Sequence, residues 1–261
     1  MSPSLARRLA SRLPRPLFRV LRRLWRVGDL LASARFLMHR GTGVPLRERL
    51  RLVGRLYAIS DHVESPHTQA EVLAFVRAIL TLPRGGRGVV VEAGCFKGSS
   101  TAKFSLAAAL AGRDLVVFDS FQGIPEHAEP HDRDIFGGKA GFAPGDYRGS
   151  LEEARANVAR WGSAESCRFV PGWFEDTLSG FGEEVSAVYL DVDLASSTRT
   201  CLRYLYPLLR PGGVLLSQDG HLPLVLEVFR DRTFWEEDVG CPMPAVQGLG
   251  TSKLLRIVKE G

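Results

Sequence analysis

Cysteine is scarce in this sequence and long apolar runs are absent, and each absence excludes a class of protein. The four cysteines (Cys95, Cys167, Cys201 and Cys241) show no C-x-x-C spacing, which argues against a zinc site and a disulfide framework. No apolar run approaches the roughly 20 residues of a membrane-spanning helix, and no uninterrupted apolar core of a secretory signal is found. We therefore expect a cytoplasmic protein, and 261 residues suffice for one large α/β domain with an appendage.

Acidic residues are nearly absent from residues 1–60, which contain 14 arginines against Asp29 and Glu48. This segment has a net charge of +12, whereas the remainder of the chain has −7. We therefore divide the chain into a basic helical N-terminal arm, residues 1–60, and a mildly acidic body, residues 61–261. The overall charge says little about what the body binds.

Arginine and large apolar residues alternate through the arm, and Pro14 and Pro16 interrupt them. A helix is predicted from about Leu17 onward, and a second, over 44–60, is predicted to pack on the body. The arm has three interpretations: packing on the body or on a second subunit, contact with an anionic membrane surface, or electrostatic binding of nucleic acid. We favour packing and keep peripheral membrane contact as the alternative. No aromatic-and-basic motif supports nucleic-acid binding.

The body begins with the pattern of a nucleotide-binding fold. A capping box, Thr68 to Glu71, opens a predicted helix. The apolar, β-branched run 89–93 then predicts a buried parallel strand. It leads through Gly94 and Gly98 into a further predicted helix, and glycines at this position let a turn approach a ligand closely.

Asp119 ends the next predicted strand, where Rossmann-type sites place a carboxylate that binds ribose hydroxyls. A nicotinamide dinucleotide would favour a full G-x-G-x-x-G turn, with its pyrophosphate at a helix N-terminus, and the sequence lacks that turn. Glu92, just before the first glycine, suits a ligand with a positive amino group and no phosphate. These features favour S-adenosylmethionine, although a helix cap or surface acid is the alternative reading of Asp119.

Two acidic clusters follow predicted buried strands in the second half of the body. Asp191 and Asp193 follow the first strand, and Gln218, Asp219 and His221 follow the second. The carboxyl ends of parallel strands are where ligands bind in open α/β sheets. Carboxylate oxygens and water suit magnesium, which lowers the pKa of a bound hydroxyl. The polar, glycine-rich segment 126–150 is predicted to form a lid over the substrate.

Four ordered segments of this sequence resemble the macrocin O-methyltransferase family, whose members methylate sugar hydroxyls of macrolides and aminocoumarins. The segments are V-V-E-A-G-C-F-K-G-S-S at 90–100, F-D-S-F-Q-G-I-P-E at 118–126, V-P-G-W-F-E-D-T-L at 170–178 and L-D-V-D-L at 190–194. Similarity runs from about Glu71 to about Phe229 and leaves out the basic arm.

The resemblance implies a Rossmann-like class I methyltransferase fold of the α/β class, with a central, mostly parallel seven-stranded sheet and helices on both faces. It also implies an S-adenosylmethionine donor and a bound Mg²⁺. The cofactor-binding residues would be Glu92, Gly94, Lys97, Gly98, Ser99, Asp119, Ser120, Phe121, Gly172, Trp173, Phe174 and Asp191. From the two acidic clusters we expect the metal ligands Asp191, Gln218 and Asp219 and the catalytic residues Asp193, as base or third ligand, and His221, as base or extra ligand.

One position departs from the family pattern, which usually has Asp-Asp where this chain has Gln218-Asp219. Glutamine is a weaker magnesium ligand, so the site would bind metal more weakly, use His221 in addition, or act without metal. The leading hypothesis is an O-methyltransferase acting on a hydroxyl of a sugar or other small natural product, and a homo-oligomer is expected. The alternatives are a non-catalytic adenosyl-binding protein docked through its arm, and an NAD-dependent oxidoreductase.

Overall fold

The structure of the chain, a computed structural model, describes residues 28–83 and 86–261. The start of the helix predicted from Leu17 therefore lies outside the described residues. Residues 28–38 are helical and lead through a short 3-10 turn, Arg40–Thr42, into helix α3, Leu46–His62. None of the described helices combines the length and the apolar character that crossing a membrane would require.

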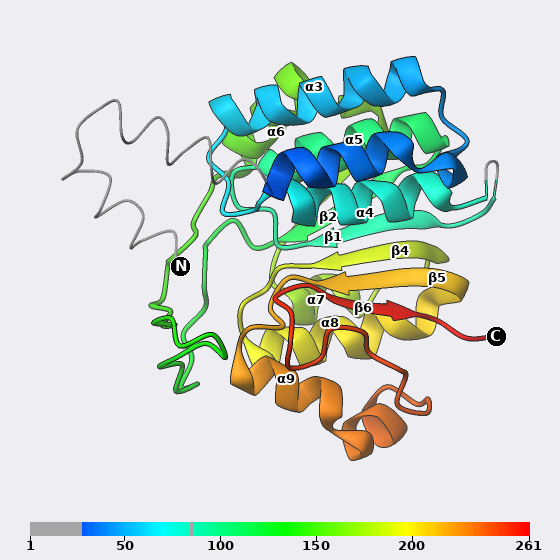
Figure 1. Cartoon of the computed structure of the whole chain (residues 1–261). Helices are drawn as coiled ribbons and strands as arrows, with labels where there is room; N and C mark the ends of the chain where they lie inside the picture. Colours follow the sequence, from blue (N-terminus) through cyan, green and yellow to red (C-terminus); the bar gives the residue numbers. More distant parts are fainter. Residues whose placement is uncertain (1–27, 84–85) are drawn as a thin grey trace.

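Six strands form one sheet in the order β3-β2-β1-β4-β5-β6 (Figure 1). The first five run parallel, and β6 pairs antiparallel with β5. Strand β4 is buried at each of its positions, as expected for an apolar parallel strand covered on both faces. The strands are β1 Val89–Ala93, β2 Leu115–Asp119, β3 Cys167–Pro171, β4 Val185–Leu190, β5 Leu209–Ser217 and β6 Leu255–Val258.

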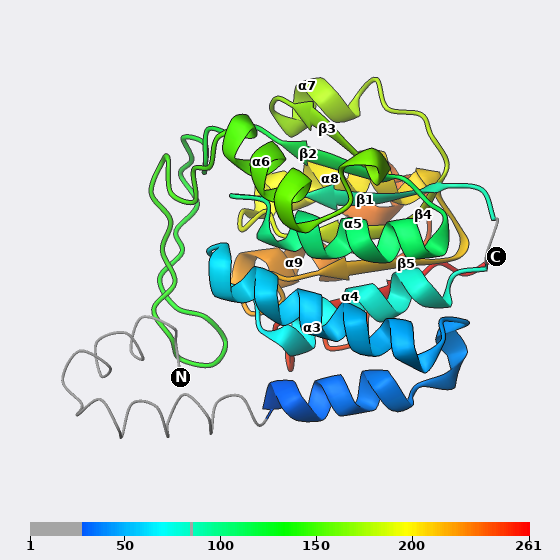
Figure 2. The same cartoon turned by 90° about the horizontal axis from the view of Figure 1, so that it is seen from above.

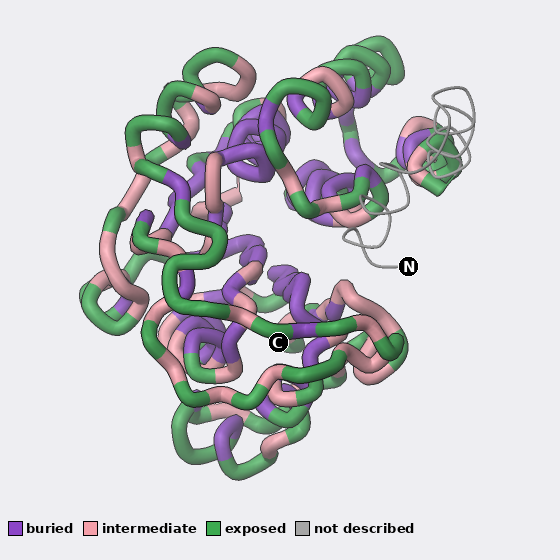
Figure 3. The backbone as a smooth tube through the Cα atoms, turned by 90° about the vertical axis from the view of Figure 1, so that its left-hand side faces the viewer, coloured by how far each residue is buried: buried purple, intermediate pink, exposed green. Residues whose placement is uncertain are grey.

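Helices cover both faces of the sheet, which gives three layers (Figures 1 and 2). One face is covered by α3, α4 Gln69–Thr81, α5 Ser99–Ala111 and α6 Leu151–Trp161, and the other by α7 Phe174–Leu178, α8 Ala195–Leu208 and α9 Pro223–Arg230. The capping box of α4 is formed as predicted. Buried residues gather along the strands and the inner sides of the helices, and exposed residues lie on the outer surface (Figure 3).

The predicted Rossmann-like α/β architecture is confirmed, but the seventh strand is not found among the described residues. The chain between the π-helical turn Phe234–Asp238 and β6 makes only an isolated bridge, Gln247 to Arg256. Pro242 and Pro244 in this segment have no backbone N–H, so they cannot donate to a strand ladder. Strand β6 therefore lies at the edge of the sheet.

Candidate functional site

Backbone hydrogen bonds hold the carboxyl ends of the strands together. The amide of Gly94 donates to the carbonyl of Phe118 at 2.9 Å, and the amide of Asp191 donates to that of Ala93 at 3.0 Å. Further bonds link β5 to β4 and β3 to β2 in the same way. The loops after β1, β2, β3, β4 and β5 therefore lie at one edge of the sheet, as the sequence predicts.

Gly94 makes this convergence close, because it lies at a φ of 84°. A Cβ at this position would lie 2.0 Å from the carbonyl oxygen of Asp191. Gly98 also has a positive φ, 78°, and caps the N-terminus of α5, with the backbone of Ala154 beside it. Gly94 is needed to bring the loop after β1 against the turn that follows β4, and Gly98 is needed to start helix α5.

Asp119 joins the loop after β1 to the loop after β2. Its Oδ2 accepts hydrogen bonds from the amides of Cys95 at 2.7 Å and Phe96 at 3.2 Å, and its Oδ1 accepts one from Phe121 at 2.7 Å. Each carboxylate oxygen has two lone pairs, so these bonds fix the group without using all of its acceptor capacity. Asp119 is thus a rigid acceptor at the position predicted for ribose binding.

The other predicted cofactor residues of β1 and its loop differ in environment. Glu92 is completely buried, and burial raises its pKa to about 8 against the opposing effect of Ser100 and Thr101. Ser99 is buried at the start of α5. Lys97 is partly exposed and forms an ion pair with Glu64 at 3.0 Å. The end of β1 and its loop therefore combine one buried acid with one partly exposed base.

The predicted adenine-binding residues lie after β2 and β3. The amide of Gly172 donates to the carbonyl of Asp119 at 3.0 Å, and Trp173 caps α7, whose first residue is Phe174. Trp173 and Phe174 are both half-buried. Phe121, at a φ of 58°, packs into the core beside Phe169, and the Ser120 hydroxyl accepts from the amide of Gln122.

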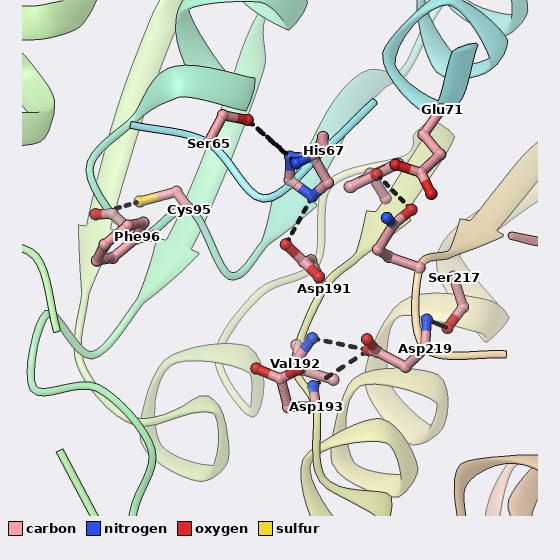
Figure 4. Close-up of polar contacts among 12 residues, drawn as sticks. Ser65, His67, Glu71, Cys95, Phe96, Asp191, Val192, Asp193, Ser217 and Asp219 are labelled. Atoms are coloured by element: carbon pink, nitrogen blue, oxygen red, sulfur yellow. Dashed lines mark hydrogen bonds and ion pairs between the residues drawn. The ribbon is translucent and has the colours of Figure 1, made fainter. Parts of the chain in front are cut away.

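Three aspartates meet at the ends of β4 and β5. Carboxylate oxygens of Asp191, Asp193 and Asp219 all lie within 4.8 Å of one another (Figure 4). Oδ2 of Asp219 accepts hydrogen bonds from the amides of Val192 at 3.0 Å and Asp193 at 3.1 Å, which fixes the turn between the other two acids. Oδ1 of Asp219 is buried and has no hydrogen-bond partner. This oxygen is available to a cation.

The electrostatics of the cluster favour the binding of a cation. Burial, with Asp219 and Asp191 adding to it, raises the pKa of Asp193 well above its usual range. Burial and the charge of Asp191 raise the pKa of Asp219 to about 7. Three carboxylates at this distance repel one another unless a proton or a metal ion lies between them. The donor set, three hard oxygen ligands, is the kind that Mg²⁺ prefers.

His67, which the sequence analysis did not identify, is the partner of Asp191. Its Nε2 lies 2.8 Å from Oδ2 of Asp191, and its side chain is only 4% exposed (Figure 4). Burial acts to raise the pKa of Asp191, but the charge and hydrogen bond of His67 lower it. His67 precedes the cap of α4, far from β4 in the sequence, so no local spacing could have connected the two residues.

Gln218 does not offer its carbonyl oxygen to the cluster. Oε1 accepts a hydrogen bond from the hydroxyl of Tyr189 at 3.0 Å. Tyr189 packs against Phe75 and Phe104, on the α4 and α5 side of the sheet. The oxygen that metal binding requires is therefore engaged elsewhere, and we leave Gln218 out of the proposed ligand set.

His221 is half-buried, and burial with the nearby charge of Lys253 lowers its pKa to about 4. Its Nδ1 is buried without a hydrogen-bond partner. Lys253 also acts to lower the pKa of Asp219. This effect is smaller than those of burial and Asp191, which raise the pKa, and than those of two backbone amides, which lower it. Lys253 follows the turn at 248–251 and is a second residue that the sequence analysis missed.

The segment predicted to form a lid, residues 126–150, forms hydrogen bonds with the start of α8 and with the loop after β5. Glu129 accepts hydrogen bonds from the amides of Ala195 and Ser196, both at 2.8 Å, at the start of α8. His131 lies 3.0 Å from the same carboxylate. The amide of Ile135 donates to the carbonyl of His221 at 2.9 Å. The segment thus lies beside the carboxylate cluster.

Comparison with known proteins identifies curated relatives that match about half of the chain. The 8-demethyl-8-(2,3-dimethoxy-alpha-L-rhamnosyl)-tetracenomycin-C 4'-O-methyltransferase of Streptomyces olivaceus is 36% identical over 146 residues, 53% of this chain and 55% of that protein. The mycinamicin III 3''-O-methyltransferase of Micromonospora griseorubida is 32% identical over 159 residues, 57% of this chain and 62% of that protein. The chain thus covers less than two thirds of the length of these relatives.

Solved structures show the same fold over most of the chain. The O-methyltransferase NovP superimposes with a TM-score of 0.61 at 20% identity, over 81% of this chain and 99% of its own. The calicheamicin methyltransferase CalS11 gives a TM-score of 0.53 at 17% identity, over 81% and 92%. The profile of one family, macrocin-O-methyltransferase (TylF), matches residues 77–249, more than half of the sequence. The chain therefore belongs to the macrocin-O-methyltransferase family.

Proposed function

We propose that this protein transfers a methyl group from S-adenosylmethionine to a hydroxyl of a sugar or other small natural product. The observation that carries the proposal is the direct contact between the glycine loop after β1 and the turn that bears Asp191 and Asp193. A donor bound on that loop would place its sulfonium beside the three aspartates. The named activities of the two curated relatives, both O-methyltransferases, support the same reaction.

The donor would lie across the loops after β1, β2 and β3. Asp119 would accept from the ribose hydroxyls, and Trp173 and Phe174 would contact the adenine, since aromatic side chains pack well on a purine. Glu92 and the Gly94–Gly98 loop would face the methionine part. Burial raises the pKa of Glu92 to about 8, so a bound ammonium group would favour its charged form.

The residues present fit a magnesium ion. Asp191 and Asp219 would hold it, with Asp193 beside them, and His67 would orient Asp191 through its hydrogen bond. When bound, Mg²⁺ would act as a Lewis acid that lowers the pKa of an acceptor hydroxyl. Oδ1 of Asp219, which is buried without a hydrogen-bond partner, would be one of the ligand atoms.

In the reaction itself, a lone pair of the acceptor oxygen forms the O–CH₃ bond while the C–S bond breaks and its electrons return to sulfur. The hydroxyl proton needs an acceptor within the site. Asp193 suits this role, because its carboxylate lies in the same cluster and a cation held by Asp191 and Asp219 would keep it ionised. His221 has an unpaired Nδ1 but a pKa of about 4, so it would be the weaker base. In-line positioning of the three atoms supplies most of the remaining rate enhancement.

The test is methyl transfer from labelled S-adenosylmethionine to a panel of rhamnosides and other glycosylated acceptors. We expect transfer by the wild-type protein and none by Asp191→Asn, with S-adenosylhomocysteine binding nearly unchanged in the variant. Exchange of the exposed carboxyl of Asp114 for an amide is the matched control and should leave both readouts as in the wild type. Full activity of the Asp191 variant would refute the assignment.

Helix α3 packs on α5 as predicted, whereas the membrane contact of the arm and the homo-oligomer stay predictions. Leu30, Leu31 and Met38 of the helical residues 28–38 are exposed, which is compatible with packing of this region on a second surface. Vesicle co-sedimentation and the mass measured by light scattering would test the two predictions separately.

A further inference from the structure

A cavity of about 270 Å³ lies between α4 and the edge of the sheet. Its lining comes from the C-terminal half of α4, from β5 and β6, and from the loop between residues 247 and 254. Figure 2 shows α4 running beside β5 at this side of the molecule. None of the three clustered aspartates lines the cavity, so it is separate from the proposed methyl-transfer site.

Two arginines line the cavity without an acidic partner. Arg77 enters from α4 and Arg256 from β6. Neither takes part in any ion pair found among the described residues. The sequence from 239 to 259, which supplies one wall, contains no acid at all. Both arginines therefore line a cavity that no acidic side chain lines, with Arg77 exposed at its surface and Arg256 half-buried.

The charge of Arg77 also acts on Arg256. Burial and then the charge of Arg77 lower the pKa of Arg256. Its side chain makes one neutral hydrogen bond, from Nη1 to Oε1 of Gln247 at 3.1 Å. A guanidinium has five donor N–H groups, so most of the donor capacity of Arg256 is left for a ligand. An anion between the two arginines would remove the repulsion and supply acceptors.

The loop wall adds a neutral donor. The hydroxyl oxygen of Ser252 accepts from the amide of Leu254 at 3.2 Å, which leaves the hydroxyl proton of Ser252 for another acceptor. The amide of Ser252 itself bonds the carbonyl of Gly248 at 2.9 Å and holds the turn in place. The wall is thus preorganised, and its free polar group is a donor, as an oxyanion requires.

We propose that this cavity is a binding site for a phosphate group, held between the guanidinium groups of Arg77 and Arg256 with the hydroxyl of Ser252. Arginine pairs with phosphate through two parallel hydrogen bonds, so two arginines can surround one phosphate. The phosphate can belong to a free ion or to the end of a larger molecule such as a nucleoside diphosphate. The proposal is independent of the methyl-transfer reaction.

The experiment is calorimetric titration of the full chain with inorganic phosphate, pyrophosphate and uridine diphosphate in a buffer free of oxyanions. We expect saturable binding at one site, and a Kd raised about tenfold or more in Arg77→Met and in Arg256→Met. Tighter binding of uridine diphosphate than of pyrophosphate would assign the site to the phosphate of a larger ligand. Equal or weaker binding of uridine diphosphate would assign the site to the free anion.

Two further variants keep the test decisive. Arg77→Glu should place a carboxylate opposite Arg256 and abolish binding while the melting temperature stays the same or rises, which separates loss of the site from misfolding. Arg51→Met, which removes an exposed arginine of α3, is the matched control for non-specific attraction of anions to the basic surface. The proposal is overturned if the wild type shows no saturable binding, or if Arg51→Met weakens binding as much as Arg77→Met does.

Discussion

Replacing Asp219 by Asn should stabilise the metal-free protein while removing its response to magnesium. Asp219 is 1% exposed and its pKa is raised from 3.8 to about 7 by burial and by Asp191. The native state therefore keeps its proton at pH values where the unfolded chain has lost it. The contribution of Asp219 to the stability of the metal-free wild type must therefore fall as the pH rises from about 4 to about 7 and stay constant above that range.

The magnitude follows from the size of the shift. One pKa unit corresponds to about 1.4 kcal/mol, so the ionised carboxylate costs at most about 4 kcal/mol above neutral pH, and relaxation of the site reduces this. Asparagine has no charge to bury, and its carbonyl oxygen can still accept from the amides of Val192 and Asp193. The variant should thus match the wild type near pH 4 and exceed it near pH 8.

Urea unfolding at about pH 5 and about pH 8, each with and without Mg²⁺, measures both effects. Magnesium should raise the stability of the wild type at the higher pH, because it binds only the native state, and leave Asp219→Asn unchanged. Asp114→Asn, which alters an exposed carboxyl, is the control and should follow the wild type. The reasoning is refuted if the Asp219 variant is the less stable protein at about pH 8 without metal.

Three further changes are expected to act at the same edge of the sheet. Gly94→Ala should lower the melting temperature and the affinity for S-adenosylhomocysteine, because a φ of 84° and the carbonyl of Asp191 leave no room for a Cβ; wild-type values for both would contradict this. His67→Leu should cost about 1 kcal/mol in urea unfolding above neutral pH, since the half-buried carboxylate of Asp191 loses its hydrogen bond, and should weaken Mg²⁺ binding measured by calorimetry. Tyr189→Phe should cost about 1–3 kcal/mol by leaving the side-chain oxygen of Gln218 without a hydrogen-bond donor, with Mg²⁺ affinity retained, and a large gain of affinity would return Gln218 to the ligand set.

The sequence was sufficient to predict the strands that carry the site and the order of their loops. Short apolar runs that end at a polar residue or a glycine indicate β1, β2, β4 and β5, because a parallel strand buried on both faces is apolar along its length. The meeting of Asp191 and Asp219 follows from the same rule, since parallel strands end at one edge. These predictions needed only local patterns.

The residues that were missed act across long separations in the sequence. His67 contacts Asp191, 124 positions later, and Glu129 contacts Ala195, 66 positions later. A lone histidine before a helix cap, or a glutamate within a polar loop, carries no signal of such a partner. Gln218 was placed among the ligands by its position in a family motif, and only the structure shows that Tyr189 engages its oxygen. The predicted seventh strand is absent from the described residues because two prolines interrupt the segment that would form it.

The central claim is that the donor and a cation bind side by side where the strands end. Paramagnetic relaxation by Mn²⁺, substituted for Mg²⁺, tests it through the NMR signals of bound S-adenosylhomocysteine. We predict strong broadening of the protons next to sulfur in the wild-type complex, and none in Asp191→Asn although the ligand still binds. A wild-type complex in which both Mn²⁺ and S-adenosylhomocysteine bind while those signals stay sharp would contradict the account.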